Sequence, residues 1–145
     1  MPYTIKAKGC ALTSLAMVMG IYGSEALPDE WNRFMLSGGY TEDARVRWDV
    51  PEYIGLASLS FSKTSGDDDT PLQNSLIDPY LKKCMPVIVK VYNPTTGNMH
   101  WVVVTGKSGN IYNINDPGYR NRENLQAYSN EIFAIRVYKK TGGCQ

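Results

Sequence analysis

The chain carries its clearest fold signal in residues 86–116, which read PVIVKVYNPTTGNMHWVVVTGKSGNIYNIND. The stretch contains short runs rich in valine, isoleucine and tyrosine, separated by glycine, asparagine and proline. Such runs between such turns are typical of β-strands. We predict strands over Val87–Tyr92, His100–Thr105 and Asn110–Asn115, and a fourth over Glu131–Tyr138. The second half of the chain is therefore expected to form an antiparallel sheet.

The first half of the chain has mainly helical patterning. From Ala11 to Tyr22 apolar side chains recur at three- and four-residue spacing, and Gly23 stands where a C-cap glycine belongs. We therefore predict a first helix here. The remaining predictions are a short helix after Pro28, a helical start at Asp49–Tyr53, a strand over Ser58–Lys63, a polar loop over Thr64–Thr70, and a helix over Leu72–Lys83 that Pro79 weakens in its middle.

Length and patterning together indicate one α+β domain. The 145 residues suffice for a single compact core and make two domains improbable. The first half of the chain is mainly helical and the second half stranded, which favours helices packed on a C-terminal antiparallel sheet. We assign residues 1–140 to this domain and residues 141–145 to a mobile C-terminal tail.

Charge and hydropathy argue against polyanionic and membrane partners. Fifteen Lys and Arg residues against fourteen Asp and Glu residues give a net charge of +1, so no nucleic acid partner is expected. No apolar run approaches the roughly 20 residues that cross a bilayer. We expect a soluble protein, either cytoplasmic or released without a visible signal peptide, whose oligomeric state the sequence leaves undefined.

The cysteine and histidine inventory limits the chemistry. Three cysteines, Cys10, Cys84 and Cys144, do not form a disulfide framework, and with His100 they lack the short spacings of zinc ligands. We therefore predict no metal. Gly106-Lys107-Ser108 resembles the end of a phosphate-binding loop, but the leading glycine is missing and no helix pattern follows, so no cofactor is predicted either.

Cys10 stands directly before the first predicted helix. The positive end of a helix dipole and its unpaired N–H groups stabilise a thiolate at such a position. The alternative is that Cys10 is a small buried apolar residue, as most free cysteines are.

His100 is the only imidazole in the chain and opens a predicted strand. A three-residue hairpin loop at Lys107-Ser108-Gly109 would place His100 directly opposite Asp116, within reach of one ring nitrogen. A carboxylate there would orient the imidazole. The alternative is that Asp116 serves only the turn Asn115-Asp116-Pro117-Gly118.

Three sequence blocks resemble one family. Residues 9–18, GCALTSLAMV, look like the active-site helix of papain-like cysteine peptidases related to the bacteriocin (double-glycine) leader-peptide peptidases. Residues 86–89 with 100–106, and then 112–117, resemble the later blocks of that family in the same order. The resemblance implies a papain-like fold, with Cys10 as nucleophile, His100 as general base and acid, and Asp116 as the residue that orients the imidazole.

The implied reaction is hydrolysis of a peptide-type amide through a thioester. The implied substrates are a bacterial or phage cell-wall (peptidoglycan-stem) peptide or a leader peptide. Enzymes of this kind usually carry a glutamine shortly before the cysteine as second oxyanion donor, and residues 1–9 contain none. Either Thr4, Lys6 or Lys8 replaces it, or the donor lies in residues that precede Met1 in the native protein.

Two other functions stay open at this stage. A catalytically weak or inactive papain-like binding module is consistent with the missing glutamine, because loss of one oxyanion donor costs on the order of a hundredfold to a thousandfold in rate. A transglutaminase-type acyltransferase would use the same triad with an amine acceptor.

Overall fold

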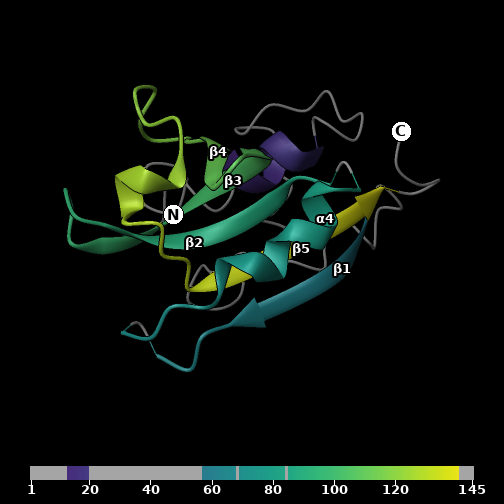
Figure 1. The fold of residues 1–145 in the computed structure, drawn as a ribbon, viewed down its shortest axis with the longest axis horizontal. Coiled ribbons are helices and arrows are strands. Elements are labelled where there is room, and N and C mark those ends of the chain that lie inside the picture. Colours follow the sequence, from purple (N-terminus) through teal and green to yellow (C-terminus); the bar gives the residue numbers. More distant parts are fainter. Residues whose placement is uncertain (1–12, 20–56, 68, 84, 141–145) are drawn as a thin grey trace, which may run out of the picture.

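A computed structural model describes residues 13–19, 57–67, 69–83 and 85–140 (Figure 1). The elements after the helical residues 13–19 are β1 (Ala57–Thr64), the 3₁₀ helix η1 (Asn74–Ile77), α4 (Asp78–Leu81), β2 (Val87–Asn93), β3 (Asn98–Ser108), β4 (Ile111–Asn115), the 3₁₀ helix η2 (Leu125–Tyr128) and β5 (Ala134–Lys140). The helices predicted after Pro28 and at Asp49–Tyr53 lie outside these residues. So does the predicted tail, and the division into one domain with a tail stays a prediction.

The strands form one five-stranded sheet in the order β1-β5-β2-β3-β4. Every neighbouring pair is antiparallel. The four strands predicted in the second half are all present, and the predicted strand at Ser58–Lys63 is β1, which joins the sheet beside the last strand of the chain. The predicted α+β class is therefore confirmed, with one strand contributed by the first half.

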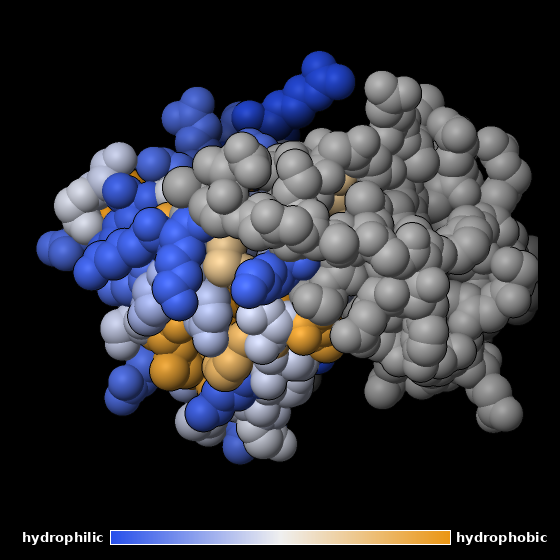
Figure 2. Space-filling model, turned by 90° about the vertical axis from the view of Figure 1, so that its right-hand side faces the viewer, coloured by the Kyte–Doolittle hydropathy of each residue, from blue (hydrophilic) through white to orange (hydrophobic). Residues whose placement is uncertain are grey.

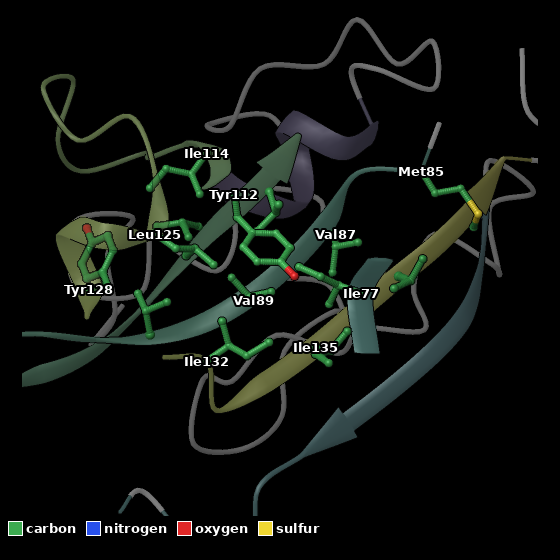
Figure 3. Close-up of a cluster of buried hydrophobic side chains, with 14 residues drawn as sticks. Ile77, Met85, Val87, Val89, Tyr112, Ile114, Leu125, Tyr128, Ile132 and Ile135 are labelled. Atoms are coloured by element: carbon green, nitrogen blue, oxygen red, sulfur yellow. The ribbon is translucent and has the colours of Figure 1, made fainter. Parts of the chain in front are cut away.

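One face of the sheet carries the main hydrophobic cluster (Figure 3). Alternate residues of β2 and β5 point into it, as the period of two in a strand requires. Helical segments cover it: Ile77 of η1 is fully buried, and Leu125 and Tyr128 of η2 close its far end. Its members are Ile77, Met85, Val87, Val89, Val91, Val102, Val104, Tyr112, Ile114, Leu125, Tyr128, Ile132, Ile135 and Val137.

The helical residues 13–19 confirm part of the first predicted helix. Leu15, Val18 and Met19 are fully buried, at the three- and four-residue spacing that the sequence showed. In Figure 1 this helix lies behind β3 and β4, whereas α4 crosses in front of the sheet. The hydroxyl of Ser14 donates to the carbonyl oxygen of Trp101 over 3.2 Å and ties the helix to β3.

The helix predicted over Leu72–Lys83 is shorter than expected. A 3₁₀ turn precedes a single α-helical turn, and Pro79 lies in the first turn of α4 rather than in the middle of a helix. Proline has no N–H and its ring clashes with the carbonyl four residues earlier, so the first turn is where a helix accepts it. Leu72 instead donates its backbone N–H to Ile132 over 2.7 Å.

The register predicted for the β3–β4 hairpin is wrong. Ser108 pairs with Ile111 and Gly106 with Asn113, so the turn consists of Gly109 and Asn110 and not of Lys107-Ser108-Gly109. Gly109 has a φ of 62°, which fits the first position of a type II′ two-residue turn and explains why glycine stands there.

The described part of the face shown in Figure 2 is mostly hydrophilic. Figure 2 shows one face on which hydrophobic residues appear in a few small groups. Among the described residues, Tyr92 and Ile111 are the large hydrophobic side chains that stay exposed. None of the described helices has the length and apolar character needed to span a membrane.

Candidate active site

His100 is a buried polar residue near the start of β3. The residue is 7% exposed, and β3 pairs it with Val91 of β2. The ring of Tyr119 meets the imidazole edge-on at 5.9 Å, and the ring of Tyr128 lies tilted at the same centroid distance. These two aromatic rings restrict the orientations that the imidazole can take.

Asp116 directly follows β4 and contacts His100. Its Oδ1 lies 2.7 Å from Nε2 of His100, and its side chain is fully buried. The Gly118 N–H also donates to Oδ1, over 2.9 Å, and the Tyr128 hydroxyl donates to Oδ2. Burial opposes ionisation of this carboxyl, but the hydrogen bonds from His100, Tyr128 and Gly118 outweigh it and hold the pKa of Asp116 below its usual value.

A β-bulge brings the two residues to the same face of the sheet. From the turn, β3 and β4 pair regularly until Gly106, and Thr105 is then the extra residue before Val104 pairs with Ile114. Continued beyond Val103 and Asn115, this pairing sets Asp116 opposite Val102, two residues from His100. Side chains two apart in a strand share a face, so the contact is diagonal and within reach of longer side chains.

A network of polar side chains extends from the Tyr128 hydroxyl that contacts Asp116, and the sequence analysis missed it. Arg122 donates to the Tyr128 hydroxyl and to Oδ1 of Asn93, both over 3.1 Å. Asn93 in turn donates to the Tyr119 hydroxyl over 2.9 Å. No sequence motif joins these residues. The one available signal was the high content of tyrosine and arginine after Asp116, which alone indicates no role.

An open cavity of about 380 Å³ adjoins Asp116. It extends between the helical residues 13–19 and the loop that follows β4. Its lining combines apolar, cationic and acidic groups: Met17, Ile114, Asn115, Asp116, Tyr119, Arg120, Arg122 and Glu123. Within the described part of the chain, no three metal-ligating side chains gather at one place.

The third predicted site residue, Cys10, lies outside the described residues, as do Cys84 and Cys144. The nearest described helical turn contains Ser14, which contacts the carbonyl of Trp101, the residue after His100. The structure therefore brings His100 and Asp116 together as predicted, and it ties the helix that follows Cys10 to the same strand.

The comparisons with known proteins bear on this arrangement. The sequence model of the Peptidase_C39 like family matches residues 1–145. The chain belongs to this family. The C39 family comprises papain-like cysteine peptidases, so the resemblance inferred from the three sequence blocks is confirmed.

A solved structure gives independent support for the fold of this C39-like chain. It is the crystal structure of a protein from Bacillus anthracis that is provisionally described as a C39-like peptidase. The two share 15% sequence identity with a TM-score of 0.53, over 92% of this chain and 89% of that one. At this identity the likeness establishes the fold alone. A comparison with functionally curated proteins gives no match.

Proposed function

We propose that this C39-like chain is a cysteine peptidase or amidase that uses Cys10, His100 and Asp116 as its catalytic triad. The observation that carries the proposal is the 2.7 Å contact between Nε2 of His100 and a fully buried carboxylate oxygen of Asp116. A carboxylate in this position orients an imidazole and stabilises the imidazolium that forms during proton transfer.

The contact also selects the ring tautomer. An ionised carboxylate only accepts hydrogen bonds, so Nε2 of neutral His100 carries the proton that it donates to Asp116. The lone pair of the neutral ring then resides on Nδ1. In the proposed reaction Nδ1 is therefore the atom that exchanges a proton with the nucleophile and the leaving group.

The position of Ser14 supports Cys10 as the nucleophile. Residues four apart lie on the same face of a helix, and Cys10 precedes Ser14 by four. Ser14 is fully buried and bonded to the residue next to His100. In the sequence, Cys10 therefore stands one helical turn's length before a residue that contacts the strand of His100.

The proposed reaction has two halves. The thiolate of Cys10 attacks the amide carbonyl carbon, the C–N bond breaks, and the imidazolium of His100 passes its proton to the leaving amine. His100 then takes a proton from water, whose oxygen attacks the thioester carbon; the C–S bond breaks, the acid is released, and the thiolate and imidazolium are restored. The backbone N–H of Cys10 would bind the oxyanion, with Thr4, Lys6 or Lys8 as candidates for the second donor.

The proposed substrates are peptides, either the stem peptides of a bacterial or phage cell wall or leader peptides. The cavity beside Asp116 is lined by charged and by apolar side chains, among them Arg120 and Glu123 as well as Met17 and Ile114. A cavity of mixed character is consistent with a peptide ligand. The compartment is proposed as either the cytoplasm or the exterior.

The test is cleavage of a quenched-fluorescent peptide library and of muropeptides by the full chain, with products read by mass spectrometry. We expect hydrolysis products from the parent protein and none from Cys10→Ala or His100→Ala. Cys144→Ala, which changes a cysteine outside the proposed triad, is the matched control and should keep the parent rate.

Two alternative functions are outcomes of the same test. A binding module without turnover would retain a peptide without cleaving it, in agreement with the missing glutamine. An acyltransferase would form a new amide when methylamine is added, at the expense of the hydrolysed product. Either result would contradict the peptidase proposal.

A further inference from the structure

The hydroxyl of Tyr128 connects the hydrophobic core to the candidate active site. Its ring lies at one end of the core cluster (Figure 3). That hydroxyl donates to Oδ2 of Asp116 and accepts from Arg122 over 3.1 Å. The residue is 3% exposed, so packing fixes where the hydroxyl stands.

Arg122 is itself held from several sides. Its two terminal nitrogens donate to Asn93, to Tyr128 and, over 2.7 Å, to the Thr95 hydroxyl. Its guanidinium lies 3.6 Å from the ring centroid of Tyr119, a distance typical of a cation–π contact. A planar guanidinium that makes several hydrogen bonds is a hydrogen-bond donor in a fixed position, unlike a flexible charged side chain on the surface.

We propose that Tyr128 and Arg122 are positioning residues that hold the carboxylate plane of Asp116 and thereby fix the tautomer of His100. The inference rests on the proposed function for its consequence in catalysis. The structural part of the inference is that the tautomer of His100 depends on Tyr128, and this part can be tested independently of the proposed function.

The geometry of the carboxylate supports this role. The χ2 torsion of an aspartate is broad, so one hydrogen bond leaves the carboxylate plane poorly defined. In this site Oδ1 receives bonds from His100 and from the Gly118 N–H, while Oδ2 receives the bond from Tyr128. Donors on both oxygens define the plane. Removing the Tyr128 hydroxyl would leave the buried Oδ2 of Asp116 without this donor, and the carboxylate could then rotate about χ2.

The donor stays protonated under ordinary conditions. Burial, and then the hydrogen bond to Asp116, raise the pKa of Tyr128 far above its usual value. The hydroxyl therefore donates to the carboxylate throughout the pH range in which a cysteine peptidase would work.

A matched control exists elsewhere in the same core. The Tyr112 hydroxyl donates to Oδ1 of Asp78 over 2.7 Å, and the residue is 6% exposed and belongs to the same cluster. Tyr112 pairs with Lys107, seven residues along β3 from His100, or about 23 Å at the usual rise of a strand. Tyr112→Phe thus removes the same kind of bond at a distance from the imidazole.

The test uses ¹⁵N correlation spectra of the full-length protein at a pH where the imidazole is neutral. His100 is the only histidine, so its two ring nitrogens give the only imidazole signals and report the tautomer directly. The samples are the parent, Tyr128→Phe, Arg122→Gln, Tyr112→Phe and Asp116→Asn, each first checked for folding by circular dichroism. Arg122 is partly exposed, so Arg122→Gln provides a reading if Tyr128→Phe does not fold.

We expect the Nε2–H tautomer in the parent and in Tyr112→Phe. In Tyr128→Phe and Arg122→Gln we expect a mixture of the Nε2–H and Nδ1–H tautomers. If the parent protein is active, these variants should also show a fall in kcat of about tenfold with little change in KM, because a catalytic group is displaced. A parent-like spectrum in folded Tyr128→Phe, or in Arg122→Gln if only that variant folds, would overturn the proposal.

The outcomes separate this inference from the proposed function. If Asp116→Asn changes the tautomer but Tyr128→Phe does not, the positioning role is wrong while the triad stands. If Tyr128→Phe changes the tautomer and the parent cleaves no peptide, the positioning role stands and the peptidase proposal is wrong.

Discussion

His100 and Asp116 meet diagonally across the end of the β3–β4 ladder, with Nε2 and Oδ1 2.7 Å apart. The extra residue Thr105 makes this contact possible. Without it, the pairing set at the turn would place Asp116 opposite Val103, on the face of the sheet that His100 does not share. The bulge shifts the register by one residue and returns Asp116 to the face of His100.

Gly118 lies so close to the imidazole that a side chain there should disturb the pair. A Cβ at this position would come within 3.2 Å of Cε1 of His100 and 3.6 Å of Oδ1 of Asp116. Two tyrosine rings flank the imidazole, so it has little room to move away. We expect Gly118→Ala to lower peptide hydrolysis by about tenfold, measured as kcat/KM.

The control for this variant is Gly106→Ala, because a Cβ at Gly106 would meet nothing within 4 Å. Gly106→Ala should keep the parent rate. Equal rates for both alanine variants would show that the imidazole tolerates displacement, and would contradict a close dependence of hydrolysis on the position of His100.

The Asp116 carboxyl should make the protein sensitive to acid. Its pKa is lower in the folded protein than the value of about 3.9 for an unfolded chain. Its ionised form therefore stabilises the fold above that value, and the stabilisation is lost as pH falls through the folded pKa. In urea titrations between pH 7 and pH 2, Asp116→Asn should lose less unfolding free energy on acidification than the parent does.

Glu131→Gln removes an exposed carboxyl and provides the comparison. It controls for the loss of one carboxylate charge from the protein. A steeper acid loss in Asp116→Asn than in the parent would contradict the assigned direction of the Asp116 pKa shift.

The fold should depend strongly on β5, which lies between β1 and β2 in the sheet. Ile135 of this strand is fully buried in the main cluster. Ile135→Ala should lower the unfolding free energy by about 2–5 kcal/mol through lost burial and the cavity left behind. Ile111, at 36% exposure, is the matched site, and Ile111→Ala should cost less than about 1 kcal/mol. Similar losses at both sites would contradict the central position of Ile135 in the core.

Much of the site was predictable because the composition and periodicity of a short segment determine whether that segment forms a strand or a helix. The valine-rich runs around His100 predict strands whatever the turn between them, so β2 and β3 were expected. The His100–Asp116 contact was predicted from a register two residues away from the observed one, and a shift of two keeps the face of a strand unchanged. The contact was therefore right although the turn was wrong.

The parts that escaped prediction depend on long-range packing. Tyr128 reaches Asp116 across 12 residues, from the last position of the 3₁₀ helix η2. Arg122 reaches Asn93 across 29 residues. Neither spacing follows from a periodic pattern, and tertiary packing alone sets these distances.

The central claim is that His100 activates the thiol of Cys10, and the rate of alkylation by iodoacetamide as a function of pH tests it most directly. Mass spectrometry resolves the three cysteines, so Cys84 and Cys144 serve as references within each sample. We predict that Cys10 reacts well below the pH at which an ordinary thiol ionises, and that His100→Ala removes this reactivity. If Cys10 follows the same pH dependence as the reference cysteines, or reacts equally fast in His100→Ala, the claim is contradicted.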